Sequence, residues 1–204
     1  MKTDDLIARL ASEPSKVSSQ FTARNASLGL LIAIPPTMAL SILLYGVRSD
    51  GPTSGLIGLA VWTLLAVISL AVATRMRLPE PPRRLMMLAP FAGLAGVLAI
   101  LAMVATAEGA VVVRVDHVLH CLQTVGLLAV LPFIGASIML RRGAPASPLV
   151  AGACAGLFAG AVGALAYSIS CPINDPLASL SAHTITVLII AAIGSVIGSK
   201  LFSW

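Results

Sequence analysis

The chain has few charged residues and few aromatic ones. Charged residues make up 10% and aromatic residues 4% of its 204 residues, whereas hydrophobic residues make up 58%. The mean hydropathy is +0.99. Soluble domains carry roughly 25% charged residues, so this composition excludes an ordinary water-soluble protein. The length of 204 residues also leaves no room for a globular domain beside a full set of membrane spans.

Several functional motifs are missing as well. The sequence contains no phosphate-binding glycine loop, no HExxH zinc motif and no CxxC pair. Ion and proton pathways through a membrane usually need buried ionisable groups. The interiors of the apolar segments offer only Gln123 and His183 for such a pathway, both near one membrane edge. A pump, a channel and a membrane protease are therefore disfavoured.

The sequence does contain six apolar segments, each long enough to cross a bilayer as a helix of roughly 17–25 residues. The first five contain no Asp, Glu, Lys or Arg, and the sixth has Lys200 near its end. We place the spans at residues 27–47, 55–74, 85–106, 122–140, 148–168 and 177–203. The sequence therefore predicts an all-α integral membrane protein, with a polar tail at 1–26 and a six-transmembrane helix bundle at 27–204.

The Lys and Arg residues predict the orientation of these spans. Of the 13 basic residues, all but Arg48 and Arg114 lie in the tail, the second and fourth loops and the C-terminal end. By the positive-inside rule both termini are then cytoplasmic. Because the charges flank apolar spans and form no continuous stripe, we expect the lipid bilayer to be a partner and nucleic acid not to be one.

Small residues predict how two of the spans pack. Glycines recur every fourth residue in the fifth and sixth spans, and this spacing lets helix backbones approach closely in a membrane. We favour packing of the fifth span against the sixth over dimerisation. The residues are Gly152, Gly156, Gly160, Gly194 and Gly198. In the first span, the pair Pro35-Pro36 should bend or interrupt the helix, because proline removes a backbone donor and clashes with the preceding turn.

Residues able to bind metals or to react with oxidants gather on the predicted outer face. Thiolate and imidazole groups select soft and borderline metals, and two thiols in an oxidising compartment can also form a disulfide. Cys121 and Cys171 could form a static disulfide. They could equally be a regulated pair of thiols or of metal ligands, with His120 as a third ligand. The set comprises Asp116, His117, His120 and Cys121 before span four, Cys171 and Asp175 after span five, and His183 inside span six.

Not all of these residues are expected to be functional. Asp116, His117 and Asp175 fit ordinary polar loop positions, and a histidine at 183 more often bonds a neighbouring helix. Cys154 lies about 25 Å along the helix from Cys171, at 1.5 Å per residue. We interpret Cys154 as a small core residue.

The tail contains a short amphipathic segment. Thr3 can cap a helix whose first turn holds Asp4 and Asp5, which complement the positive end of the helix dipole. The apolar residues that follow fall on one face, at Leu6, Ile7 and Leu10. So short a helix is marginal alone, and the face should rest either in a groove of a partner or on the membrane surface. The tail is polar through residue 26, so we expect no cleavable signal peptide.

Four segments in a fixed order resemble a known family. They are Met-Lys-Thr-Asp-Asp-Leu-Ile-Ala-Arg-Leu-Ala at residues 1–11, Cys-Leu-Gln-Thr-Val-Gly-Leu-Leu at 121–128, Cys-Pro-Ile-Asn-Asp-Pro-Leu at 171–177, and a glycine-rich last span closing on Lys-Leu-Phe-Ser-Trp at 200–204. Together they resemble the NrsF-type family of six-span membrane anti-sigma factors, over the full length of the chain.

The resemblance implies a function and its residues. Such a protein holds an extracytoplasmic-function (ECF) sigma factor inactive at the cytoplasmic side of the membrane and releases it under heavy-metal or oxidative stress. It implies that the tail contributes to sigma binding and that Cys121 and Cys171 are the sensory thiols. The tail residues concerned are Asp4, Asp5, Leu6, Ile7 and Leu10. No cofactor is implied, and a heavy-metal ion enters only as the signal. Near Ala182 and His183 the chain departs from the family, where an aromatic pair is expected.

Two other classes of function remain open. A membrane thiol oxidoreductase would also carry outer cysteines, but such enzymes generally need a resolving pair, and quinone-dependent turnover of a substrate thiol would identify one. A small metal transporter would need ligands in mid-membrane, and metal flux into liposomes would identify it. We expect a regulator and not an enzyme.

Overall fold

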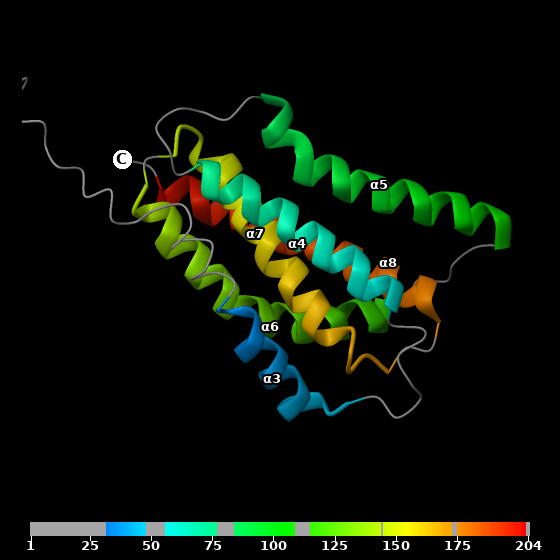
Figure 1. Ribbon diagram of the computed structural model, residues 1–204. Helices are drawn as coiled ribbons and strands as arrows, with labels where there is room; N and C mark the ends of the chain where they lie inside the picture. The colour runs from blue at the N-terminus through cyan, green and yellow to red at the C-terminus, as the bar shows by residue number, and fades with distance from the viewer. Residues whose placement is uncertain are drawn as a thin grey trace, which may run out of the picture.

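The computed structural model describes residues 32–47, 56–76, 84–108, 115–143, 145–172 and 175–202. Within these ranges the chain forms six α-helices and no strand (Figure 1). The helices are α3 (Ile34–Tyr45), α4 (Leu56–Met76), α5 (Arg84–Glu108), α6 (Val115–Arg141), α7 (Pro148–Tyr167) and α8 (Pro176–Leu201). The predicted all-α class is confirmed. The predicted tail, 1–26, lies outside the described residues.

Helix α7 is the centre of the bundle. It contacts each of the other five helices, and every residue from Ala151 to Tyr167 is buried. Most of these residues are alanine or glycine, so the helix is apolar on all sides and narrow. A helix without a polar face is stable only when it is surrounded, and its small side chains let the neighbouring backbones come close.

The glycines of α7 and α8 lie against each other. A Cβ atom added at Gly156 would be 2.7 Å from the Ile190 carbonyl oxygen, and one added at Gly194 would be 2.7 Å from the Gly152 carbonyl oxygen. Neither position has space for a side chain. The favoured prediction, packing of the fifth span against the sixth, is confirmed.

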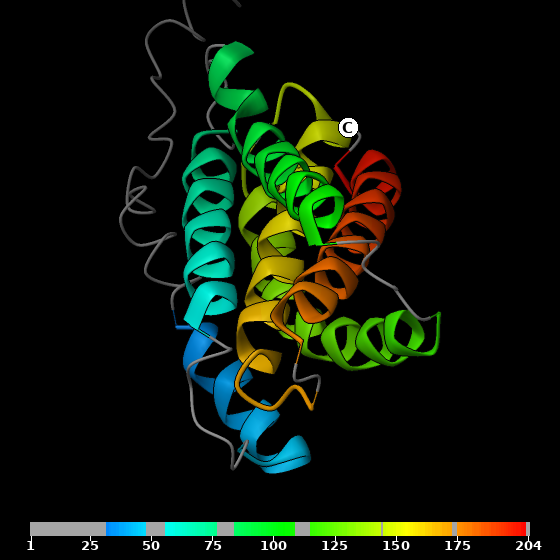
Figure 2. The same cartoon turned by 90° about the vertical axis from the view of Figure 1, so that its right-hand side faces the viewer.

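Helix α6 begins seven residues earlier than the predicted fourth span. Its buried residues follow one face toward α7, including Cys121, Thr124, Val125 and Leu128. The spacing of three and four residues is that of a helix with one packed side. Figures 1 and 2 show α6 bent along its length, and Pro132 inside the helix supplies the cause.

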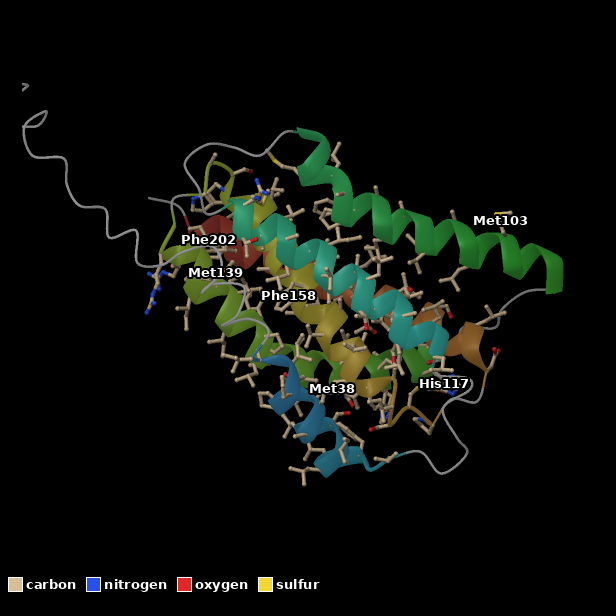
Figure 3. The ribbon with its side chains drawn as sticks, in the orientation of Figure 1. Met38, Met103, His117, Met139, Phe158 and Phe202 are labelled. Atoms are coloured by element: carbon tan, nitrogen blue, oxygen red, sulfur yellow. The ribbon has the colours of Figure 1, made fainter. Side chains whose placement is uncertain are left out.

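Four of the helices contain segments that are long and apolar enough to cross a membrane. These segments are Gly58–Met76, Val115–Arg141, Pro148–Tyr167 and Leu177–Leu201. The stretches Ile34–Tyr45 and Met87–Ala99 are apolar but shorter. Helix α3 starts at Ile34, and the pair Pro35-Pro36 occupies its first turn. The surface carries many exposed large apolar side chains, such as Leu43 on α3 and Met103 on α5 (Figure 3). Such a surface fits lipid and not water. The count of six spans stays a prediction.

The helices alternate in direction and so collect basic residues at one end. The C-terminal ends of α4, α6 and α8 lie together with the start of α7 (Figures 1 and 2). Their last turns carry Arg75, Arg141 and Lys200 respectively, where cations complement the negative end of the helix dipole. Figure 3 shows Met139 and Phe202 near this end and His117 at the opposite end.

Candidate thiol site and its aromatic surroundings

Both predicted sensory cysteines are buried. Cys121 is 1% exposed and Cys171 is 2% exposed, and both are free thiols. Neither thiol is therefore open to solvent in this arrangement. Cys121 is inside α6, because that helix starts at Val115, and it lies on the face that packs against the bundle. Cys171 comes after the three-residue turn that follows α7 and is buried there.

The structure brings the two thiols into one region, between α6 and the α7–α8 connection. Each thiol lies within electrostatic range of the other and of the Tyr167 hydroxyl. The Cys171 sulfur is 3.5 Å from the Ser179 hydroxyl of α8. Cys121 and Cys171 therefore lie where α6, the α7–α8 connection and α8 come together. A change in the bonding of either sulfur affects how these three elements pack.

His120 does not form a metal-binding group with the two thiols in the described parts of the chain. Its Nε2 atom is 3.0 Å from the Tyr167 hydroxyl, and its side chain is exposed. Among the residues that the structure describes, no three His, Cys, Asp or Glu side chains are grouped so as to hold a metal ion. Binding of a metal by Cys121, Cys171 and His120 together stays a prediction that needs a side-chain rearrangement.

Tyr167 is the centre of an aromatic cluster that the sequence analysis missed. Its ring centroid is 5.5 Å from that of Tyr45, 6.2 Å from that of His120 and 5.7 Å from that of His183. His183 in turn lies 6.2 Å from Trp62. The five rings come from five helices, α3, α4, α6, α7 and α8. Both tyrosines of the chain are in this cluster, and that scarcity is the signal that could have found it.

His183 and Trp62 form a buried ring pair between α8 and α4. They are 1% and 0% exposed. The buried Nε2 atom of His183 and Nε1 atom of Trp62 have no hydrogen-bond partner in the described parts of the chain, so the expected bond from His183 Nε2 to a neighbouring helix is not found. An unpaired buried polar group costs about 1–3 kcal/mol. The contact between His183 and Trp62 is therefore stabilised by the packing of their rings.

The remaining predicted residues have structural positions. Asp175 caps α8, since its carboxylate accepts a hydrogen bond of 2.9 Å from the Leu177 backbone N–H, and Asp116 lies in the first turn of α6. Both are places where a carboxylate stabilises a helix. Cys154 is 0% exposed, which confirms it as a core residue. The predicted sigma-binding residues Asp4, Asp5, Leu6, Ile7 and Leu10 lie outside the described residues.

A bundle of long apolar helices with an apolar outer surface defines a helical membrane protein. Residues 10–204 match the family described as "NrsF: Negative regulator of sigma F". The chain belongs to this family of anti-sigma factors, as the four sequence segments predicted. A curated relative, "Probable anti-sigma-F factor NrsF" of Azospira oryzae, is 28% identical over 220 residues, which cover 100% of both chains. No solved structure matches the chain. The family is a regulatory one.

Proposed function

We propose that the protein is an anti-sigma factor of the bacterial inner membrane, which retains an ECF sigma factor at its cytoplasmic face and releases it when Cys121 and Cys171 react with an oxidant or a heavy metal. Family membership supports the anti-sigma function. The observation that carries the sensory part is a pair of buried free thiols, one on α6 and one in the α7–α8 connection, within electrostatic range of each other.

The proposed topology has six spans with both termini in the cytoplasm. Four helices contain segments of spanning length, and the alternating helices collect Arg75, Arg141 and Lys200 at one end of the bundle. The positive-inside rule makes this the cytoplasmic end. The thiol pair is then at the opposite, periplasmic end. A signal from outside the cell reaches the thiols first.

The signalling chemistry involves only the two sulfur atoms. Oxidation joins them in a disulfide and transfers two protons and two electrons to the oxidant, so that one hydrogen peroxide becomes two water molecules. Binding of a divalent soft metal instead replaces the two thiol protons by one ion. Both reactions use the thiolate. Because the thiols are 1% and 2% exposed, the helices must first separate locally to admit a reagent.

This requirement turns the reaction into a conformational signal. A reagent that reaches only the open arrangement stabilises that arrangement. Conversion from nearly complete retention to nearly complete release needs about 5.5 kcal/mol of differential stabilisation. Two thiolate–metal bonds, or one disulfide, are of sufficient strength. The open arrangement then has a lower affinity for the sigma factor.

The first test is co-purification of the detergent-solubilised protein with sigma factors of its own host. The full chain is compared with a version that lacks residues 1–26. We expect the full chain to capture one ECF sigma factor and the shortened chain to lose it, since the tail carries the apolar face of Leu6, Ile7 and Leu10. Absence of any sigma factor from the full-chain sample would contradict the proposal.

The sensory role is tested in cells with a sigma-dependent reporter. The double variant Cys121→Ala, Cys171→Ala should keep the sigma factor inactive after exposure to cadmium or diamide, whereas the wild type releases it. Cys154→Ala is the matched control, because Cys154 is also a buried free thiol but lies elsewhere on α7. A normal response in the double variant, or loss of the response in the control, would show that this pair is not the sensor.

A further inference from the structure

Helix α3 is supported by two helices only. Within the described residues it contacts α6 and α7, and it has no contact with α4, α5 or α8. Figures 1 and 2 show it at the margin of the bundle. Its buried residues are Thr37 and Ser41, and most of its other side chains are exposed. The position of α3 therefore depends on α6, which carries Cys121, and on α7, which leads into Cys171.

The hydrogen bonds and the ring contact of α3 involve the end of α7 and the turn that follows it, in the five residues just before Cys171. The buried Ser41 hydroxyl donates a hydrogen bond of 2.9 Å to the Ala166 carbonyl oxygen. The Ser170 hydroxyl donates one of 2.6 Å to the Gly46 carbonyl oxygen, and it is 3.3 Å from the Ser41 hydroxyl. Tyr45 packs edge-on against Tyr167. We call this set of contacts between Ser41–Gly46 and Ala166–Ser170 the α3 latch.

We propose that the α3 latch transmits the state of the thiol pair to the N-terminal tail. This inference rests on the proposed function. In the chain, α3 is the helix that follows the tail, and no other described helix lies between them. A rearrangement that moves Cys171 relative to α6 displaces residues 166–170, and α3 either follows that segment or detaches from it. In both cases the start of α3, from which the chain runs back toward the tail, changes position relative to the cytoplasmic end of the bundle.

The chemistry of the latch favours two discrete positions over a gradual shift. In an apolar environment, no water competes for a hydroxyl or a carbonyl group. Ser41 is 0% exposed, so its hydroxyl depends on protein partners, which are the Ala166 carbonyl and the Ser170 hydroxyl. An unpaired buried donor is unfavourable, which makes intermediate positions of α3 poorly populated. Coupling between distant sites needs an element with this two-state property.

The test uses Ser41→Ala with Thr37→Val as its matched control. Both variants remove a buried hydroxyl from the same helix, one turn apart. Among the described residues, the Thr37 hydroxyl bonds the carbonyl of Ala33, the N-cap of its own helix, at 2.7 Å, whereas the Ser41 hydroxyl bonds α7. We expect Ser41→Ala to retain the sigma factor at rest and to reduce its release by diamide about fivefold, the effect of one lost hydrogen bond. Thr37→Val should respond like the wild type.

A second variant covers the case in which Ser41→Ala fails to accumulate in the membrane. Ser170 is at a partly exposed position, and Ser170→Ala removes its bond to the Gly46 carbonyl without leaving a hole in the core. It should weaken release in the same direction. Release equal to that of the wild type in the accumulating latch variants would overturn the proposal.

The same experiment separates this inference from the proposed function. Labelling of Cys121 and Cys171 before and after diamide reports whether the thiols have reacted. If the thiols react and the wild type releases the sigma factor, but the latch variants release it equally, only the latch is wrong. If the wild type releases no sigma factor although its thiols have reacted, the proposed sensory function itself is wrong.

Discussion

The contact between α7 and α8 allows a quantitative prediction for Gly156→Ala. The added Cβ atom would lie 2.7 Å from the Ile190 carbonyl oxygen and 2.8 Å from the Ala191 Cα atom, where ordinary contacts begin at 3.4 Å. The obstacles are backbone atoms and cannot rotate away. The two helices must therefore separate by roughly 0.7 Å, the shortfall in these distances. A gap of about 0.5–1 Å forfeits a quarter to a half of the dispersion energy of each facing atom pair.

Overpacking of this kind costs about 1–3 kcal/mol, and we expect the upper half of that range because the whole α7–α8 interface is affected. The assay is unfolding of the purified protein in mixed micelles by increasing SDS, followed by circular dichroism. Gly135→Ala is the matched control, since a Cβ atom at Gly135 of α6 meets nothing within 4 Å. Equal midpoints for Gly156→Ala and wild type, or an equal loss in the control, would refute the close-contact reasoning.

Three further predictions follow from single contacts. Asp175→Ala removes the N-cap of α8 and should lower the free energy of unfolding by about 1 kcal/mol, and an unchanged SDS midpoint would contradict this role. Tyr167→Phe, which loses the bond to His120, should cost about 1 kcal/mol, whereas Tyr167→Ala should cost about 3–5 kcal/mol; similar losses for both would mean that the ring packing is unimportant. Maleimide should label Cys121 and Cys171 slowly in membranes and fast after SDS denaturation, because both thiols are buried; fast labelling of the native protein would contradict the burial.

The sequence was sufficient for the positions of most helices. The predicted spans 148–168 and 177–203 agree with α7 and α8 to within a few residues, because hydropathy and flanking Pro, Asp and Arg residues mark where apolar helices start and end. The glycine spacing also identified the correct partner of α7. The span 122–140 was too short, because Asp116, His117 and His120 resemble a polar loop although they form the first turns of α6.

The surroundings of the thiols could not be predicted in the same way. Hydropathy places Cys121 near one end of a span, but it does not say which face of the helix packs against α7. Cys171 follows a helix end, where burial depends on how the chain packs against α8. Tyr167 was missed for a related reason: a single aromatic residue at the end of a span is a common feature, and its importance lies in ring contacts with three other helices, α3, α6 and α8.

The most direct test of the account measures sigma retention by the purified full chain in lipid nanodiscs, before and after diamide, for the wild type and for Cys121→Ala, Cys171→Ala. The account predicts that the wild type binds the sigma factor tightly when reduced and loses it after oxidation, and that the double variant binds it equally under both conditions. Retention by the oxidised wild type, or loss from the treated double variant, would contradict the claim that these two buried thiols control release.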